Sequence, residues 1–180
     1  MNPMSKIKSA FERSAKAMEL KPEMGRVTKQ AEARLVNGLA CEVREGNWTF
    51  TNDMPEGMGG DDTGPGPGTF CRMALGSCLA IGYAQWLSLK DVPYGEINVK
   101  VEGDLDFSGI LGVDDSIAPG HEELRVSVNI ESPAPRAEIE RIIELADRHS
   151  PVLHLITKPV PVKRELTLTV PAAEPATVAT

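Results

Sequence analysis

The side chains with the greatest chemical potential in this chain are its three cysteines, Cys41, Cys71 and Cys78. Cys71 and Cys78 lie in a mostly apolar stretch, residues 69–89, whose composition predicts one long helix. Seven residues of helix separate these two cysteines by about 10 Å, which is too far for a disulfide between them. A thiol becomes a nucleophile when a neighbouring cation lowers its pKa, and without one it is an inert core group. Both interpretations of Cys78 are open at this point.

Other common kinds of site are not indicated. The histidines His121, His149 and His154 form no HExxH motif and the chain has no CxxC pair, so we expect no metal ion. There is no GxSxG motif either. The glycine-rich segment 53–68 lacks the Lys-Ser/Thr ending of a phosphate loop, and its acidic residues would repel phosphate. We therefore expect no cofactor, and a structured loop that leads into the long helix.

Charge and composition exclude several classes of partner. The 180 residues include 19 basic and 26 acidic side chains, a net charge of −7, and only 4% aromatics. This balance argues against nucleic acid as a ligand. No run approaches 18 apolar residues, so we expect no membrane-spanning segment. Three cysteines are too few for a disulfide framework, which suits a reducing compartment, and we expect a cytoplasmic protein.

The first half of the chain reads as a helix followed by a small sheet. Apolar residues recur at helical spacing over residues 5–20, and Pro22 ends this pattern. Three short strands are then predicted over residues 26–36, 39–44 and 48–51. The Asn37-Gly38 pair is a strong hairpin signal because both residues tolerate positive φ. The long helix at 69–89 follows, and because it is apolar on nearly all sides we expect it to be buried.

The second half adds two longer strands, a helix and a last strand. The strands are predicted over residues 96–107 and 124–130, the helix over 136–149, a turn over 152–157 and the last strand over 163–170. Strands and helices come in blocks, which indicates an α+β fold. We expect antiparallel sheets packed around a long buried central helix.

Three segments in order resemble the OsmC/Ohr family of osmotically inducible and organic hydroperoxide resistance proteins. ALGSCLAIGYA (74–84) resembles the central helix of that family, and MPEGMGG (54–60) resembles its P-x-E-x-G-G stretch. HSPVLHLITKPVPV (149–162) is similar to its His-Cys-Pro segment. The resemblance covers an OsmC-like domain over residues 26–170. The helix predicted near the N-terminus makes residues 1–25 a helical extension, and residues 171–180, which lack apolar periodicity, are expected to be a flexible tail. The resemblance also implies an intertwined homodimer with sites at the subunit interface.

The resemblance further implies a thiol peroxidase. In the family, one cysteine of the buried helix attacks the peroxide and a second cysteine closes a disulfide. Cys78 matches the first cysteine, whereas Ser150 stands at the position of the second. Gly68 occupies the position of the family's glutamate, and Arg34 is the nearest candidate for its activating arginine.

Three hypotheses about function follow. In the first, Cys78 reduces a small organic hydroperoxide and an external thiol, Cys71 or Cys41 resolves the oxidised sulfur, with Arg34, His149 and Ser150 as possible supporting residues. In the second, the dimer is a non-catalytic module that binds a small apolar ligand. In the third, Cys78 is a redox sensor that changes the dimer when it is oxidised.

Overall fold

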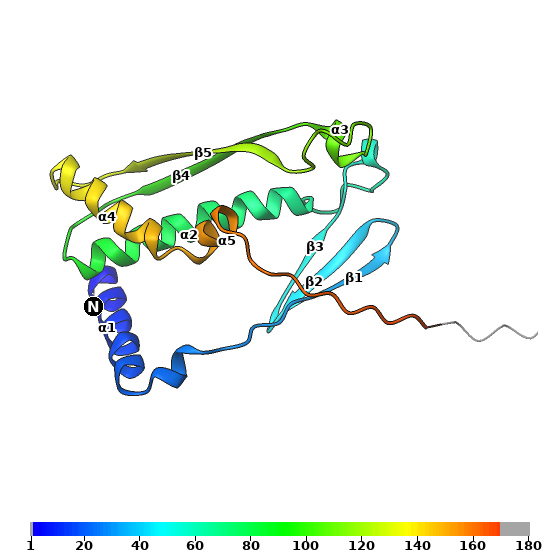
Figure 1. Ribbon diagram of the computed structural model, residues 1–180. Coiled ribbons are helices and arrows are strands. Elements are labelled where there is room, and N and C mark those ends of the chain that lie inside the picture. Colours follow the sequence, from blue (N-terminus) through cyan, green and yellow to red (C-terminus); the bar gives the residue numbers. More distant parts are fainter. Residues whose placement is uncertain (1, 170–180) are drawn as a thin grey trace, which may run out of the picture.

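Helix α2 (Pro67–Leu89) is the central element of the structure, a computed structural model that describes residues 2–169. Strands β4 (Ile97–Leu105) and β5 (His121–Ile130) pair antiparallel, and this two-stranded sheet runs alongside α2 (Figure 1). Helices α4 (Arg136–Arg148) and α5 (Pro151–Thr157) pack on α2 as well. The expected α+β class, with antiparallel sheets and one long central helix, is confirmed.

Strand β4 follows the alternation in the sequence, whereas β5 does so only in part, with Val126 and Val128 exposed. Half-buried side chains alternate with exposed ones along β4, and those that pack on the core include Ile97, Val99 and Val101. β4 ends at Leu105 and not at residue 107 as predicted, because the Asp106 carboxylate accepts the backbone N–H of Ser108 (2.8 Å) and caps α3 (Phe107–Ile110).

One side of α2 forms the core, which corrects the expectation of a helix buried all round. Leu75, Leu79 and Leu87 are at most 2% exposed and pack against the sheet and α4. On another side of the same helix, Met73 is 56% and Ile81 60% exposed. Packing within the described part of the chain therefore covers only part of the apolar surface of α2.

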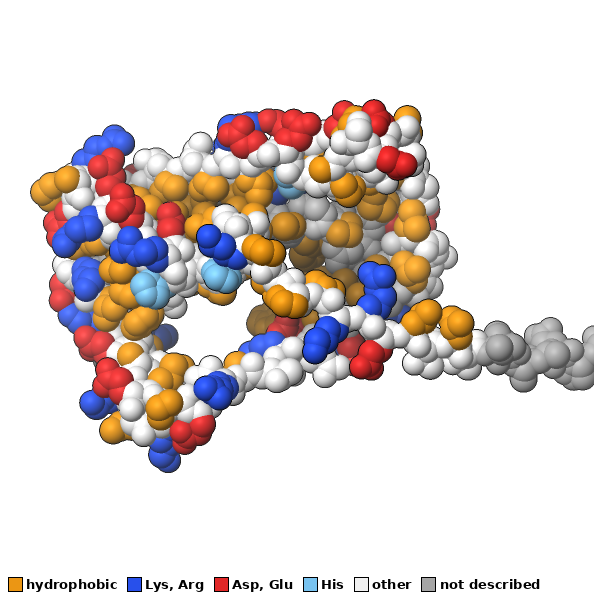
Figure 2. Space-filling view, in the orientation of Figure 1, with side chains coloured by type: hydrophobic (Ala, Val, Ile, Leu, Met, Phe, Trp, Pro, Cys, Tyr) orange, Lys and Arg blue, Asp and Glu red, His pale blue; other side chains and the backbone are white. Residues whose placement is uncertain are grey.

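The predicted three-stranded meander is present as β1 (Glu32–Asn37), β2 (Ala40–Glu45) and β3 (Trp48–Asn52). Gly38 and Gly46 make its two turns with φ of +50° and +56°, a conformation that favours glycine. β1 begins later than the predicted residue 26, since β2 offers pairing partners only from Glu32 onward. The sheet contacts α2 through Phe50 of β3 and Phe70, whose ring centroids lie 6.0 Å apart in an edge-on arrangement. Figure 2 shows an opening between the α2 body and the segment that leads from α1 to this sheet.

The N-terminal helix α1 (Pro3–Leu20) crosses α2 near its C-terminal end (Figure 1). Asn2 caps it by accepting the backbone N–H of Met4 (3.1 Å). Phe11 packs edge-on against Trp86 with ring centroids 5.6 Å apart, and Lys8 pairs with Asp91. A short 3-10 helix, η1 (Pro22–Gly25), follows and leads toward the first sheet.

The glycine-rich loop before α2 is ordered around one buried carboxylate, that of Asp53, as expected for a structured loop. Asp53 is 2% exposed and accepts the backbone N–H groups of Met54, Asp61 and Thr63 (2.7–3.2 Å). It also accepts the Thr63 hydroxyl at 2.8 Å. These bonds, those from Thr63 foremost, hold the pKa of Asp53 below its ordinary value. The loop includes the 3-10 helix η2 (Glu56–Met58).

The C-terminal part departs from the sequence prediction. The expected turn at 152–157 is the helix α5. The strand predicted over 163–170 is wrong for residues 163–169, which form no strand and have exposed side chains, Leu166 and Leu168 among them. A strand needs a neighbouring strand for its hydrogen bonds, and within the described chain no strand pairs with this segment. Val170 and the predicted flexible tail 171–180 lie outside the described residues.

Across residues 2–169, none of the helices combines the length and the apolar character that crossing a membrane would require.

Candidate functional site

The structure brings together Cys78 and Ser150, the two residues that match the family's cysteine positions. Cys78 is half-buried on α2 and its Sγ lies 3.3 Å from the Oγ of Ser150. Ser150 is only 7% exposed. This distance is a hydrogen bond, which either group can donate when the sulfur is a thiol.

The second hydrogen bond of Ser150 decides which group donates when the sulfur is ionised. Ser150 is the N-cap of α5, where its Oγ accepts the backbone N–H of Leu153 at 3.3 Å. That bond uses a lone pair of the hydroxyl and leaves its single proton free. A Cys78 thiolate can only accept, so the Ser150 hydroxyl is set to donate to it. A hydrogen bond to the charged form favours that form.

The other predicted site residues lie elsewhere. Arg34 is an exposed residue of β1 and pairs with Glu42 of β2 at 3.2 Å, on the three-stranded sheet (Figure 1). The His149 ring is 4.8 Å from that of Trp86, and its Nδ1 lies 2.8 Å from the carbonyl oxygen of Leu145. His149 therefore lies at the end of α4, and neither Arg34 nor His149 hydrogen bonds to Cys78 within the described chain.

The remaining thiols do not reach Cys78 directly. Cys71 is exposed on α2, two helical turns earlier, and Cys41 is half-buried on β2. All three cysteines are free thiols. Gly68, at the position of the family's glutamate, lies beside Arg72, since a Cβ there would be 3.8 Å from the Arg72 guanidinium.

A buried polar pair next to this site was not predicted from the sequence. Tyr83 is 2% exposed, and its hydroxyl donates to the Oδ1 of Asp147 at 2.9 Å. Burial raises the pKa of Tyr83, and burial also raises the pKa of Asp147. A tyrosine in an apolar helix needs a partner for its hydroxyl, and that need was the available signal in the sequence.

A second polar contact lies at the other end of α2. The Arg72 guanidinium is 3.4 Å from the Nε2 of His121 and donates to the Thr69 hydroxyl at 3.2 Å. The Nδ1 of His121 lies 3.3 Å from the carbonyl oxygen of Asp104. This contact ties the start of α2 to the β4–β5 sheet.

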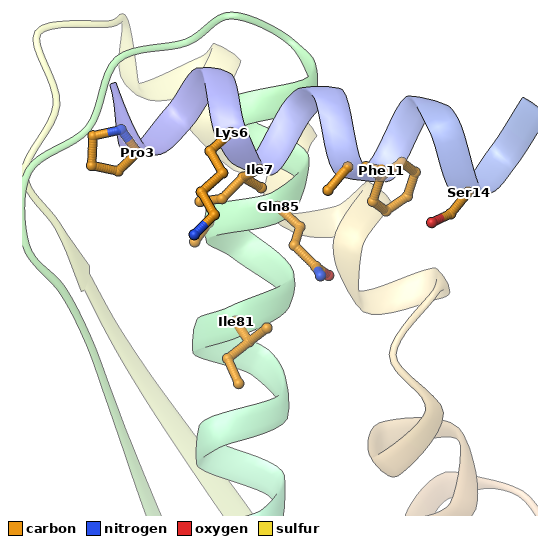
Figure 3. A pocket seen from close by; sticks show the side chains of 9 residues that line it. Pro3, Lys6, Ile7, Phe11, Ser14, Ile81 and Gln85 are labelled. Carbon is orange, nitrogen blue, oxygen red and sulfur yellow. The ribbon is translucent and has the colours of Figure 1, made fainter. Parts of the chain in front are cut away.

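An apolar groove of about 700 Å³ lies in the angle between α1 and α2 (Figure 3). Its lining includes Ile7 and Phe11 from α1 and Ile81 from α2, with Lys6 as the charged member of the set. A volume of this size suits a small-molecule site. Residues 2–169 contain no group of three or more His, Cys, Asp or Glu side chains that could hold a metal ion.

Comparisons with known proteins agree with this fold. A family model described as OsmC-like protein matches residues 59–165, more than half of the chain. No curated protein matches the sequence. An OsmC like protein from Mycoplasma pneumoniae is similar in structure, with 17% identity, a TM-score of 0.62 and coverage of 73% of this chain and 88% of that one.

Two further solved structures show the same fold. An OsmC-like protein of unknown function from Vibrio cholerae is 10% identical with a TM-score of 0.55, and covers 72% of this chain and 93% of its own. An organic hydroperoxide resistance protein from Elizabethkingia anophelis, with thiocyanate bound, is 20% identical with a TM-score of 0.51, at 72% and 87% coverage. At these identities the similarity establishes the fold.

Proposed function

We propose, because this chain belongs to the OsmC-like protein family, that it reduces organic hydroperoxides with the thiol of Cys78 as the nucleophile. The observation that carries this proposal is the 3.3 Å contact between the Cys78 sulfur and the Ser150 hydroxyl. A hydroxyl whose own lone pair caps α5 is a fixed donor, and a fixed donor stabilises a thiolate. Cys78 is half-buried.

The chemistry begins with attack of the Cys78 thiolate on the terminal oxygen of a hydroperoxide ROOH. An S–O bond forms as the O–O bond breaks, and the alkoxide leaves and takes a proton to become the alcohol ROH. The sulfur is oxidised to sulfenic acid and the peroxide is reduced. The Ser150 hydroxyl donates to the sulfur before this step.

Resolution requires an external thiol, because a serine cannot form a disulfide. A first thiol R′SH condenses with the sulfenic acid, which releases water and forms a mixed disulfide. A second R′SH attacks that disulfide, releases R′SSR′ and restores the Cys78 thiol. A dithiol reductant supplies both equivalents from one molecule. Cys71 is two helical turns away and is a poor substitute.

We also propose that the chain works as a homodimer. Apolar side chains are exposed on α2, where Ile81 is 60% exposed, and on the first sheet, where Leu35 is 65% and Phe50 is 51% exposed. The segment 163–169, with alternating Leu166 and Leu168, pairs with no strand among residues 2–169. A second copy would cover these surfaces. Light scattering after size-exclusion chromatography should give twice the chain mass, and a monomer at micromolar concentration would contradict this.

The first test of the peroxidase proposal is a single-turnover oxidation. The protein is treated with one equivalent of cumene hydroperoxide in the presence of dimedone, which traps sulfenic acids, and is then mapped by mass spectrometry. The adduct should appear on the peptide that carries Cys78. The Cys71→Ser variant, which keeps Cys78, should give the same yield, and an adduct on Cys71 or Cys41 alone would overturn the assignment.

The groove between α1 and α2 favours a second candidate, a module that binds a small apolar ligand without turnover. Its volume of about 700 Å³ and its apolar lining are the supporting observations. The fluorescent apolar probe ANS should then bind, and the Ile81→Asp variant should weaken that binding at least tenfold. If the protein gave no dimedone adduct but bound ANS in this way, the ligand-binding function would be the better account.

A further inference from the structure

The Tyr83–Asp147 pair lies where two helices and the candidate site meet. Tyr83 is five residues after Cys78 on α2, and its hydroxyl donates to Asp147 near the end of α4. Tyr83, together with Leu75, Leu79 and Ala146, forms one buried cluster. The hydroxyl–carboxylate bond is therefore set at the edge of an otherwise apolar contact between α2 and α4.

Asp147 is connected in turn to Ser150. The backbone N–H of Ser150 donates to the backbone carbonyl oxygen of Asp147 at 3.2 Å, in the turn that separates α4 from α5. Ser150 then contacts the sulfur of Cys78, back on α2. The contacts form a closed ring that starts at Cys78, follows α2 to Tyr83, crosses to Asp147, and returns through Ser150.

A buried polar pair of this kind needs an explanation, because burying polar groups costs more free energy than burying apolar side chains of the same size. Burial raises the pKa of the Asp147 carboxyl, so its charged form is disfavoured there. Two apolar side chains of similar size would pack without that cost. A hydrogen bond, in contrast with an apolar contact, is satisfied in only a narrow range of distances and angles. The pair therefore fixes where the last turn of α4 sits relative to α2.

We propose that Tyr83 and Asp147 are positioning residues, which hold Ser150 at hydrogen-bond distance from Cys78. The proposal rests on the proposed function in one respect, namely that the thiolate of Cys78 is the reacting group. Neither residue hydrogen bonds to the sulfur in this structure, so their influence passes through Ser150. The competing positioning contacts are those of α5, whose Val152 and Leu153 pack on the same core.

The test measures the pH dependence of Cys78 alkylation by iodoacetamide, in a Cys41→Ser/Cys71→Ser background where Cys78 is the single thiol. Ser150→Ala should move this profile to higher pH, so that the alkylation rate below the midpoint falls about tenfold. Tyr83→Phe should raise the midpoint by a similar amount, because it removes only the hydroxyl that orients Asp147.

Two variants of Asp147 separate position from charge. Asp147→Asn keeps an oxygen that can accept from Tyr83 and should leave the midpoint near that of the parent. Asp147→Leu removes the acceptor and should behave as Tyr83→Phe does. If Asp147→Asn instead shifted the midpoint as strongly as Asp147→Leu, a direct effect of the carboxylate charge would replace the positioning role.

The double variant Tyr83→Phe/Ser150→Ala decides whether the effect passes through Ser150. Its midpoint should equal that of Ser150→Ala alone, because there is no hydroxyl left to position. Additive shifts, or an unchanged midpoint in Tyr83→Phe and Asp147→Leu, would overturn the proposal. Circular dichroism verifies that each variant is folded, and the two single variants are independent routes to the same answer.

This assay needs no peroxide, so its outcome is separable from that of the proposed function. If the alkylation midpoints behave as predicted but the protein shows no peroxide turnover, the peroxidase proposal is refuted and the positioning role stands. If the protein turns over peroxide but Tyr83→Phe leaves the midpoint unchanged, the positioning role is refuted and the peroxidase proposal stands.

Discussion

The hydroxyl oxygen of Ser150 lies 3.3 Å from the sulfur of Cys78, although 72 residues separate them in the chain. Helix α2 supplies one of them and the start of α5 the other. A serine at this point supplies a hydrogen bond where a second cysteine would supply a disulfide. Because serine cannot form a disulfide, an oxidised Cys78 would need an external thiol to reduce it.

Replacement of Ser150 by cysteine should create the missing disulfide. The Cys78 sulfur lies 3.3 Å from the Ser150 oxygen, and side-chain rotation of Cys78 and the new cysteine can bring two sulfurs to the bond length of about 2.05 Å. One equivalent of hydroperoxide should then remove two free thiols per chain of Ser150→Cys, counted with a thiol reagent.

The matched control for that experiment is Ser77→Cys. Ser77 is exposed on α2 next to Cys78, and neighbouring residues of a helix point in different directions. This variant should gain one free thiol and form no disulfide with Cys78. Equal thiol loss in both variants would mean that the oxidation is unspecific.

Asp53 should make the protein sensitive to acid. Its pKa is lowered in the folded state, so its contribution to the free energy of unfolding is complete above the unfolded value of about 4 and is lost as the pH falls through the lower folded value. Urea denaturation should show Asp53→Asn as less stable than the parent at pH 7, with a gap that narrows below pH 4. A gap that stays constant with pH would contradict this.

Asp147 should have the opposite effect on the pH dependence. Burial raises its pKa in the folded state, so its favourable contribution is complete below the unfolded value of about 4 and is lost as the pH rises through the folded value. Asp147→Asn should therefore be at least as stable as the parent at pH 7 and lose this advantage in acid. Urea denaturation curves at pH 3.5 and pH 7 test this prediction. A free energy of unfolding at pH 7 that is lower for Asp147→Asn than for the parent would refute it.

Helix α1 should depend on the contact between Phe11 and Trp86. The edge-on pair is worth about 1 kcal/mol, or about a fivefold change in an equilibrium. Phe11→Ala should therefore speed hydrogen exchange of the α1 amides at least fivefold. Phe107→Ala, which changes an exposed ring on α3, serves as the control, and equal exchange in both variants would show that α1 is held by other contacts.

The sequence predicted local elements well, because alternation and helical spacing report which side chains face a core. β4 and the apolar stripe of α4 follow that logic, with Ile142 and Ala146 buried as expected. β5 follows it only in part, since Leu124 and Ile130 are half-buried whereas Val126 and Val128 are exposed. The strand prediction for residues 163–169 was wrong because an alternating segment forms a strand only when another strand is available to pair with it. The prediction that α2 is buried on nearly all sides was wrong at Ile81 for a related reason, since apolar composition does not say what will cover a helix face.

For the candidate site, the family resemblance located Cys78 and Ser150, and the structure placed them in contact. Arg34 was taken from proximity to the first hairpin, and it pairs with Glu42 instead. Tyr83 and Asp147 were missed because their side chains meet across 64 residues of chain, and no local pattern reports such a pair.

The most direct test of the central claim is steady-state consumption of cumene hydroperoxide with a dithiol reductant. The parent and Cys71→Ser proteins should turn over many equivalents of peroxide per chain, whereas Cys78→Ser should reduce the rate to that of the reductant alone. Turnover that survives in Cys78→Ser, or is absent from the parent protein, would contradict the assignment of Cys78 as a peroxidase nucleophile.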